Sequence, residues 1–304
     1  MTEPTEGTEQ PTTQYTEGME QPTTQTADVS GSTAAQHNPG TAAANYVYAI
    51  GTVDFRFPTL ALEKEFAQAT GRAEETAGQT DREAIHSVLS EPANRYLVRQ
   101  LCFVMTLQGL ETYILYPRDT ADLDLLVEAV RTAPRPGTDV NVVIGMRGPI
   151  APPEACNGLM VPIVVVDQLY SFDLDSLIEG VPLPGSIPED QEEQFRSTIE
   201  ELFRRTMQLT DNAGATDEHR ALNYLAVRYP AIYERTAQAY QDDYSLTEVA
   251  VRPSRLSGVR KIVDVVFSYT HRQTDVTEKY FVRVDVTEEF PFLVTKLSPY
   301  YDRY

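Results

Sequence analysis

The chain has 304 residues, 41% of them hydrophobic, which is enough for one large domain or two medium ones with a sizeable core. Its formal net charge of −20 argues against nucleic-acid binding, which needs an extended cationic surface. We find no basic segment followed by an apolar one at the start, and no apolar run near the ~20 residues that span a bilayer. The sequence therefore predicts neither a secretory signal nor a membrane helix.

The first 44 residues read as a low-complexity acidic tail. TEGTEQPTTQ at 5–14 returns as TEGMEQPTTQ at 16–25, and residues 1–44 contain six acids but no Lys or Arg. Burial of so few apolar residues cannot offset the entropy lost when the tail becomes ordered. We therefore expect this tail to be disordered. A flexible solubilising segment is the simplest interpretation. An interaction arm, or a recognition tag or substrate, remains the alternative.

Order is expected to begin near Tyr46. Alternation, capping residues and prolines predict, in chain order, a strand at 47–57, helices at 59–70, 80–90 and 92–100, and a helix at 120–130. The runs LCFVMTL and LETYILYP flank the dipeptide Gln108-Gly109, and this spacing predicts a β-hairpin. Strands at 140–148 and 163–172 are predicted on either side of a proline-rich, irregular stretch.

The second half begins with helices and ends with strands. Helices are predicted at 188–209, 216–230 and 231–240, and strands at 245–256, 259–273 and 277–297. These elements predict an α+β fold of mixed helices and antiparallel strands, with a helical middle section and a C-terminal β-hairpin unit. We expect one folded domain at 45–304. A division of this domain into two subdomains, 45–180 and 181–304, is the alternative.

The two cysteines, Cys102 and Cys156, lie far apart in the sequence and form no CxxC pair. Buried free thiols in a cytoplasmic protein are the predicted state. Cys156, His219 and His271 come from three separate segments and are the candidate ligands if a zinc site exists. Because a structural zinc site usually has at least one close pair of ligands, the sequence predicts no cofactor and keeps zinc as the alternative.

Five cations gather in the stretch RPSRLSGVRKIVDVVFSYTHR at 252–272. On a strand, Arg260 and Lys261 would point to opposite faces, so the cations do not form one stripe. Arg252, Arg255 and Arg260 could form a small site for a carboxylate or an acidic peptide. In so acidic a chain, pairing with the protein's own acids is the simpler expectation.

Familiar catalytic patterns are missing. The sequence contains no GxGxxG, no GxxxxGK[ST] and no GxSxG motif. Asp217, Glu218 and His219 stand together at a helix start, where capping and the helix dipole explain them with fewer assumptions than proton transfer needs. A metal-assisted hydrolase or peptide-modifying enzyme using His219 and Cys156 is kept as the alternative to a protein without catalytic activity.

Long stretches of the chain resemble a known family. They are RFPTLALEKEFAQATGR, NRYLVRQLCFVMTLQGLETYILYPRD, VIGMRGPIAPPEACNGLMVPIVVVDQLYSFD, NAGATDEHRALNYLAVRYPAIY and RPSRLSGVRKIVDVVFSYTHRQTDVTEKYFVRVDVTEEFPFLVTKLSPYYDR. Over about 45–304 they are similar to the C-terminal domain of unknown function of the cyanobactin maturation protease PatG, which also ends its partner PatA. In that family the domain follows a subtilisin-like protease, whose triad has no counterpart positions in this sequence.

The resemblance implies a role in the maturation of a ribosomally synthesised, modified peptide, and it implies no reaction. We expect a non-catalytic, cytoplasmic accessory protein that recognises a precursor peptide or partner maturation enzymes. Neither nucleic acid nor a membrane is an expected partner.

Overall fold

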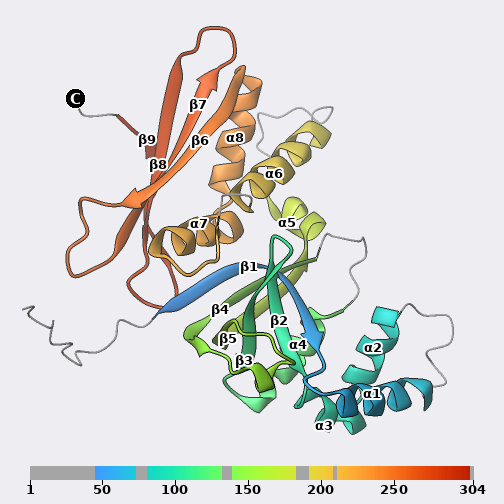
Figure 1. The fold of residues 1–304 in the computed structure, drawn as a ribbon. Helices are drawn as coiled ribbons and strands as arrows, with labels where there is room; N and C mark the ends of the chain where they lie inside the picture. The colour runs from blue at the N-terminus through green and yellow to red at the C-terminus, as the bar shows by residue number, and fades with distance from the viewer. Residues whose placement is uncertain (1–44, 73–80, 132–138, 183–191, 208–210, 302–304) are drawn as a thin grey trace, which may run out of the picture. The chain divides into compact units, whose positions relative to one another are not determined.

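A computed structural model describes residues 45–72, 81–131, 139–182, 192–207 and 211–301 (Figure 1). The chain divides into two units, Met1–Ala42 and Ala43–Tyr304, and every element below belongs to the second. The acidic tail predicted at 1–44 lies outside the described residues, so its interpretation stays a prediction, as does the division into two subdomains.

The first five strands close into a barrel. They are β1 (Tyr46–Arg56), β2 (Cys102–Leu107), β3 (Leu110–Pro117), β4 (Asp139–Ile150) and β5 (Pro162–Asp173). Their order around the barrel is β1-β2-β3-β5-β4, and β3 and β5 are the parallel pair. With a helix between the third and fourth strands, this is the topology of the OB-fold. Gln108 and Gly109 take the left-handed φ values of 50° and 82° that a tight hairpin turn needs, so the predicted hairpin is confirmed.

Short helices cap the barrel interior. They are α1 (Leu60–Arg72), α2 (Asp81–Ser90), α3 (Arg95–Val98), which follows a 3-10 turn at Pro92–Asn94, and α4 (Leu123–Ala129). The hydroxyl of Thr59 accepts the backbone N–H of Leu62, so the predicted cap of α1 is formed. Apolar side chains of these helices join inward-facing barrel residues in one core, including Phe66, Leu97, Phe103, Met105 and Leu126.

Four helices separate the barrel from a second sheet. They are α5 (Leu174–Gly180), α6 (Glu192–Met207), α7 (Asp217–Arg228) and α8 (Ala231–Gln241). The antiparallel sheet then follows in the order β6 (Tyr244–Pro253), β7 (Ile262–His271), β8 (Thr277–Asp285) and β9 (Phe292–Pro299) (Figure 1). The predicted α+β class is thus confirmed.

The alternation predicted for β7 decides which face of this sheet packs against the helices. Val263, Val265, Phe267 and Tyr269 all enter the core that α7 and α8 share with the sheet. The hydroxyl groups of Thr236 on α8 and Tyr269 lie 2.9 Å apart, within hydrogen-bond distance. We call the opposite side the outward face.

Buried hydrogen bonds tie the barrel to the helical section. The backbone N–H of Tyr48 on β1 donates to the carbonyl of Gly214 at 2.8 Å. The side-chain amide of Asn223 on α7 donates to the carbonyl of Tyr48 at 2.7 Å, and the amide of Asn212 donates to Asn223. Because buried amides are costly without partners, this network fixes α7 against β1.

The structure differs from the predicted elements at one strand and by one additional helix. One long strand was expected at 277–297, but β8 and β9 are separate strands joined by residues 286–291. Pro291 directly precedes β9, and proline cannot donate to a ladder inside a sheet. Helix α5 was not predicted. The helix expected at 188–209 is α6, and both ends of that expected range lie outside the described residues.

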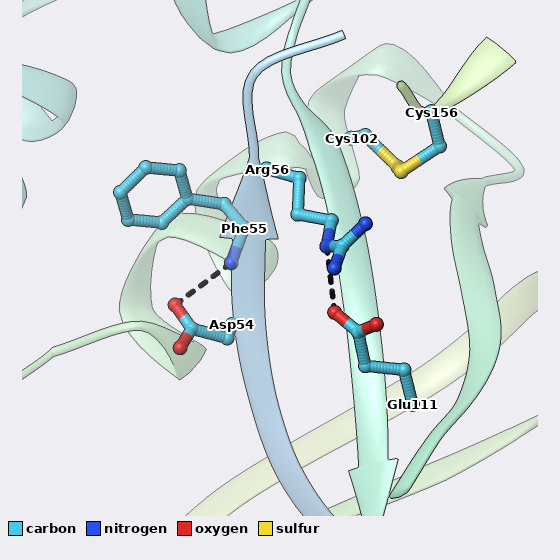
Figure 2. Close-up of a disulfide and its surroundings, with 6 residues drawn as sticks. All are labelled: Asp54, Phe55, Arg56, Cys102, Glu111 and Cys156. Atoms are coloured by element: carbon cyan, nitrogen blue, oxygen red, sulfur yellow. Dashed lines mark hydrogen bonds and ion pairs between the residues drawn. A yellow bond between two sulfur atoms is a disulfide. The ribbon is translucent and has the colours of Figure 1, made fainter. Parts of the chain in front are cut away.

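The prediction of two free thiols was also wrong, because Cys102 and Cys156 form a disulfide (Figure 2). Cys102 begins β2, and Cys156 lies in the loop between β4 and β5. With Val104, Ile114 and Ala151 they make a small apolar cluster on the outside of the barrel wall. The argument for a cytoplasmic location that rested on free thiols therefore no longer holds, because disulfides persist mainly where thiols are not kept reduced.

Candidate functional site

The loop between β6 and β7 is held in shape by its own hydrogen bonds. The backbone N–H of Ser254 donates to the carbonyl of Ile262 at 2.8 Å. The Ser257 hydroxyl donates to the same carbonyl at 2.7 Å and accepts the N–H of Ile262 at 3.0 Å. These bonds close the loop at its base, so the side chains at its tip are presented by an ordered backbone.

The tip of this loop exposes two aliphatic side chains. Leu256 keeps 61% and Val259 100% of its surface in contact with solvent. Arg255 lies beside them and is exposed, and within the described part of the chain it makes no ion pair or hydrogen bond through its side chain. An ordered loop that exposes apolar groups next to an unpaired cation has the chemistry of a contact surface.

The other two predicted arginines flank this loop and have partners. Arg252, on the outward face at the end of β6, donates to the Tyr300 hydroxyl, and its guanidinium lies 5.1 Å from the centre of that ring. Arg260 pairs with the buried carboxylate of Asp285 and lies 5.2 Å from the Phe292 ring. Both arginines therefore combine a charge with an aromatic surface.

Lys261 takes a different direction from Arg260. Its amino group lies 3.2 Å from the Asp217 carboxylate at the start of α7. The two neighbouring cations thus pair with acids on different elements, as strand alternation indicates. The cations of the 252–272 stretch are distributed between two sides of the sheet rather than gathered in one stripe.

The centre of the outward face continues this pattern of arginine and aromatic groups. Arg283 on β8 donates to Asp264 on β7 at 3.0 Å and lies 4.7 Å from the Phe281 ring. The rings of Phe281 and Tyr300 meet edge to face at 5.6 Å. These long side chains cover the strands, which explains why Asp264 is largely buried although it faces outward.

A second cluster of ionisable groups, which the sequence did not reveal, lies where the barrel meets the β8–β9 loop. Arg118 donates to both carboxylate oxygens of Asp167, with Nη2 2.7 Å from Oδ2. Asp167 and the carboxyl group of Glu289 influence each other's pKa. Burial raises the pKa of Glu289 to about 7, and its contact with Asp167 acts in the same direction.

Neither acid in that pair carries a sequence signal. Asp167 sits in the apolar run IVVVDQLY, and Glu289 in TEEF. The strand register explains Asp167. Gly145 pairs with Val166 and Ile144 with Gln168, so Asp167 is the extra residue of a β-bulge. Such a bulge depends on pairing between distant segments and is not visible in one strand.

The three residues predicted as zinc ligands do not come together. Cys156 is in the disulfide and has no thiolate to offer. His219 lies in the first turn of α7, where Lys261 pairs with Asp217. His271 ends β7, ten residues after Lys261, and therefore lies roughly 30 Å from Lys261 along the strand. Nδ1 of His271 already accepts two backbone N–H groups of its own turn. The described residues contain no group of three His, Cys, Asp or Glu side chains placed for a metal.

Comparison with known proteins supports the resemblance inferred from the sequence. Residues 189–300 match the family described as PatG C-terminal. A solved structure titled "PatG Domain of Unknown Function" matches with a TM-score of 0.69 and 19% identity, over 84% of this chain and 99% of that chain. The chain has the PatG-domain fold. The resemblance to the PatG C-terminal domain is therefore confirmed, and it covers the barrel as well as the C-terminal sheet.

No curated protein matches the chain. Among the helices that the structure describes, none is long and apolar enough to cross a membrane. The matching structure is titled as a domain of unknown function, so the function proposed below rests on the chemistry of the surface.

Proposed function

We propose that this chain is a non-catalytic accessory domain that binds a peptide segment during the maturation of a ribosomally made, modified peptide. The segment would belong to the precursor peptide or to a maturation enzyme. The pathway is proposed from the PatG-domain fold and family match. The observation that carries the binding role is the ordered β6–β7 loop, which exposes Leu256 and Val259 beside the unpaired Arg255.

The chemistry of this region favours an acidic segment with apolar side chains. On the outward side of β6, β7 and β8, together with two arginines of the β6–β7 loop, five cations stand against three acids. The cations are Arg252, Arg255, Arg260, Lys279 and Arg283, and the acids are Glu248, Asp264 and Asp285. This local excess is opposite in sign to the charge of the whole chain. Guanidinium groups bind carboxylates in a forked geometry, and the exposed Leu256 and Val259 offer apolar contact at the same place.

A second surface that OB-folds use for ligands is less suitable here. Such barrels bind on the outer side of β2 and β3. In this chain that side contributes Val104 and Ile114 to the cluster covered by Ala151 and Cys156 of the β4–β5 loop. The disulfide holds that loop in place, which leaves the C-terminal sheet as the better candidate.

The proposal can be tested by fluorescence anisotropy with a short labelled peptide that alternates Glu with Leu and Phe, and with precursor peptides of cyanobactin type. Arg255→Glu should weaken binding about tenfold or more, because it reverses an unpaired charge at the contact. The paired substitution Leu256→Ser with Val259→Ser should weaken it similarly.

Arg99→Glu is the matched control, since Arg99 is an exposed arginine in the helical cap of the barrel and carries the same charge change. Binding that persists in the loop variants, or that falls equally with Arg99→Glu, would show that the loop is not the contact. Absence of binding to every acidic and precursor peptide would remove the proposed function.

A further inference from the structure

Tyr300 directly follows β9, and its side chain lies over the outward face of the sheet. Its ring meets the ring of Phe281 on β8 edge to face at 5.6 Å. Its hydroxyl accepts a hydrogen bond from Arg252 on β6, whose guanidinium lies 5.1 Å from the centre of the same ring. Because β7 runs between β8 and β6, this one side chain reaches across the middle of the face.

The strands beneath Tyr300 offer an apolar surface. Val266 on β7 stands in register with Phe281 on one side and with Ala250 of β6 on the other. Its neighbour Val265 packs against the helices, so strand alternation turns Val266 outward, yet only 4% of Val266 is exposed. An aromatic ring at this place rests on apolar side chains and on the edge of another ring, and Tyr300 shows that such a ring fits.

Arg252 pairs with no acid in the part of the chain that the structure describes. Asp264 stands opposite Arg252 on β7, but its carboxylate accepts from Arg283 at 3.0 Å. The partner of Arg252 is instead the neutral hydroxyl of Tyr300. A guanidinium binds a carboxylate through two parallel hydrogen bonds between opposite charges, which a single neutral hydroxyl does not match. A carboxylate that reaches Arg252 is therefore a better partner than Tyr300.

β9 does not depend on Tyr300 for its place in the sheet. Leu297 packs against the core that the helices share with the sheet, and its backbone N–H donates to the Tyr229 hydroxyl at 2.9 Å. Among the described residues, Tyr300 itself is held by one backbone bond, from its N–H to the carbonyl of Lys279 at 2.7 Å. The next residue, Tyr301, keeps 80% of its surface exposed. The Tyr300 side chain is therefore free to leave the face while β9 stays paired.

The place that Tyr300 occupies is continuous with the proposed peptide contact. Arg252 is the last but one residue of β6 and stands three residues before Arg255, the unpaired cation of the β6–β7 loop. A peptide that lays apolar side chains against the tip of this loop brings its neighbouring residues to Arg252. Those residues then meet the surface that Tyr300 covers in the free protein.

We propose that Tyr300 occupies, in the free protein, the place of an aromatic side chain of the bound peptide, and that a segment with a Phe or Tyr close to an acidic residue displaces it. The ring of the ligand then packs on Phe281, and its carboxylate binds Arg252 in place of the Tyr300 hydroxyl. This inference rests on the proposed function and adds a specificity to it, because the peptide needs an aromatic residue as well as negative charge.

The displacement is measured directly at position 300. The chain contains no Trp, so Tyr300→Trp places a single fluorescent ring on the outward face. Quenching of its emission by acrylamide reports how far this ring is exposed to solvent. Saturation with the unlabelled peptide that alternates Glu with Leu and Phe should raise the quenching constant about twofold, because the displaced ring meets solvent on both sides. The same peptide with Leu in place of each Phe should not raise it.

Removal of the ring provides the second test. In Tyr300→Ala the dissociation constant of the Phe-containing peptide should fall about fivefold or more, because the ligand no longer competes with Tyr300. Tyr301→Ala removes the exposed neighbouring ring and is the matched control, which should leave the constant unchanged. Arg252→Gln in the Tyr300→Ala protein should abolish the gain, since the carboxylate of the ligand then has no guanidinium to bind.

The outcomes separate this inference from the proposed function. Peptide binding that Tyr300→Ala weakens or leaves unchanged, or a quenching constant that does not rise at saturation, overturns the displacement while the proposed function stands. Absence of binding to every acidic peptide, in the parent chain and in Tyr300→Ala alike, removes both. Thermal unfolding of Tyr300→Ala beside the parent chain shows whether the variant is folded, and if it is not, the quenching of Tyr300→Trp decides.

Discussion

Cys102 and Cys156 are joined across 54 positions of sequence, which fastens the loop between β4 and β5 to the outside of the barrel wall (Figure 2). Both sulfur-bearing residues are almost wholly buried, so the bond is sheltered from thiols in solution. Closing a loop of this length removes entropy from the unfolded chain.

The double substitution Cys102→Ser and Cys156→Ser should lower the free energy of unfolding by about 4 kcal/mol, as loop-closure entropy predicts. Chemical denaturation of the oxidised protein and of this variant gives the difference. The fully reduced parent protein is the control, and it should resemble the variant. Equal stability of all three would mean that the bond contributes nothing to the fold.

Arg220 is a buried cation that holds the β8–β9 loop through its backbone carbonyls. Only about 3% of its side chain is exposed, and its guanidinium also lies 5.2 Å from the Tyr46 ring. Arg220→Met would leave these carbonyls without their donor and would remove one of the two cations beside Asp217, so we expect a loss of about 3 kcal/mol in unfolding free energy.

Lys261→Met is the matched comparison for Arg220→Met. It removes a cation from the same carboxylate of Asp217, but Lys261 is about half exposed. We expect a change below about 1 kcal/mol, as for surface pairs. Similar losses in the two variants would show that burial of Arg220 is not what makes it important.

Local sequence signals predicted the local structure well. The Gln108-Gly109 turn, the Thr59 cap and the alternation of β7 all depend on residues close together in the chain, and all three are formed. The Thr216 hydroxyl likewise caps α7 by accepting the N–H of His219. Such features need no knowledge of the rest of the fold.

What the sequence could not predict depends on distant pairing. Closure of the barrel requires β1 to pair with both β2 and β4, and nothing within β1 specifies those partners. The meeting of Cys102 with Cys156 follows from that closure. The contact of Asp167 with Glu289 requires in addition a bulge in β5 and the placement of the β8–β9 loop. For the site, alternation predicted that Arg260 and Lys261 diverge, but not which acids they meet.

Gly214 and Gly71 provide a contrast between a required glycine and a replaceable one. Gly214 has a φ of 70°, and a Cβ there would lie 2.3 Å from the carbonyl oxygen of Tyr48. Gly214→Ala should therefore cost at least about 2 kcal/mol and weaken the contact between β1 and α7. Gly71, in the last turn of α1, has open space around it.

Because alanine favours helix more than glycine does, Gly71→Ala should stabilise the protein by about 0.5–1 kcal/mol. Thermal unfolding of the two variants beside the parent chain measures both effects. A stabilising Gly214→Ala would contradict the close approach of Tyr48, and a strongly destabilising Gly71→Ala would contradict the open space around α1.

The protonated carboxyl of Glu289 should also make stability depend on pH. Folding raises the pKa of Glu289 from its ordinary 4.5 to about 7, chiefly through burial. The folded state then binds more protons than the unfolded state between these values. The contribution of Glu289 to stability is therefore complete below about pH 4.5 and is lost as the pH rises through about 7.

Denaturant midpoints measured across this range should therefore fall with pH more steeply in the parent chain than in Glu289→Gln. Glu288→Gln, which alters the exposed neighbour, should keep the parent's slope. A parent slope equal to that of Glu289→Gln would mean that Glu289 takes up no proton on folding.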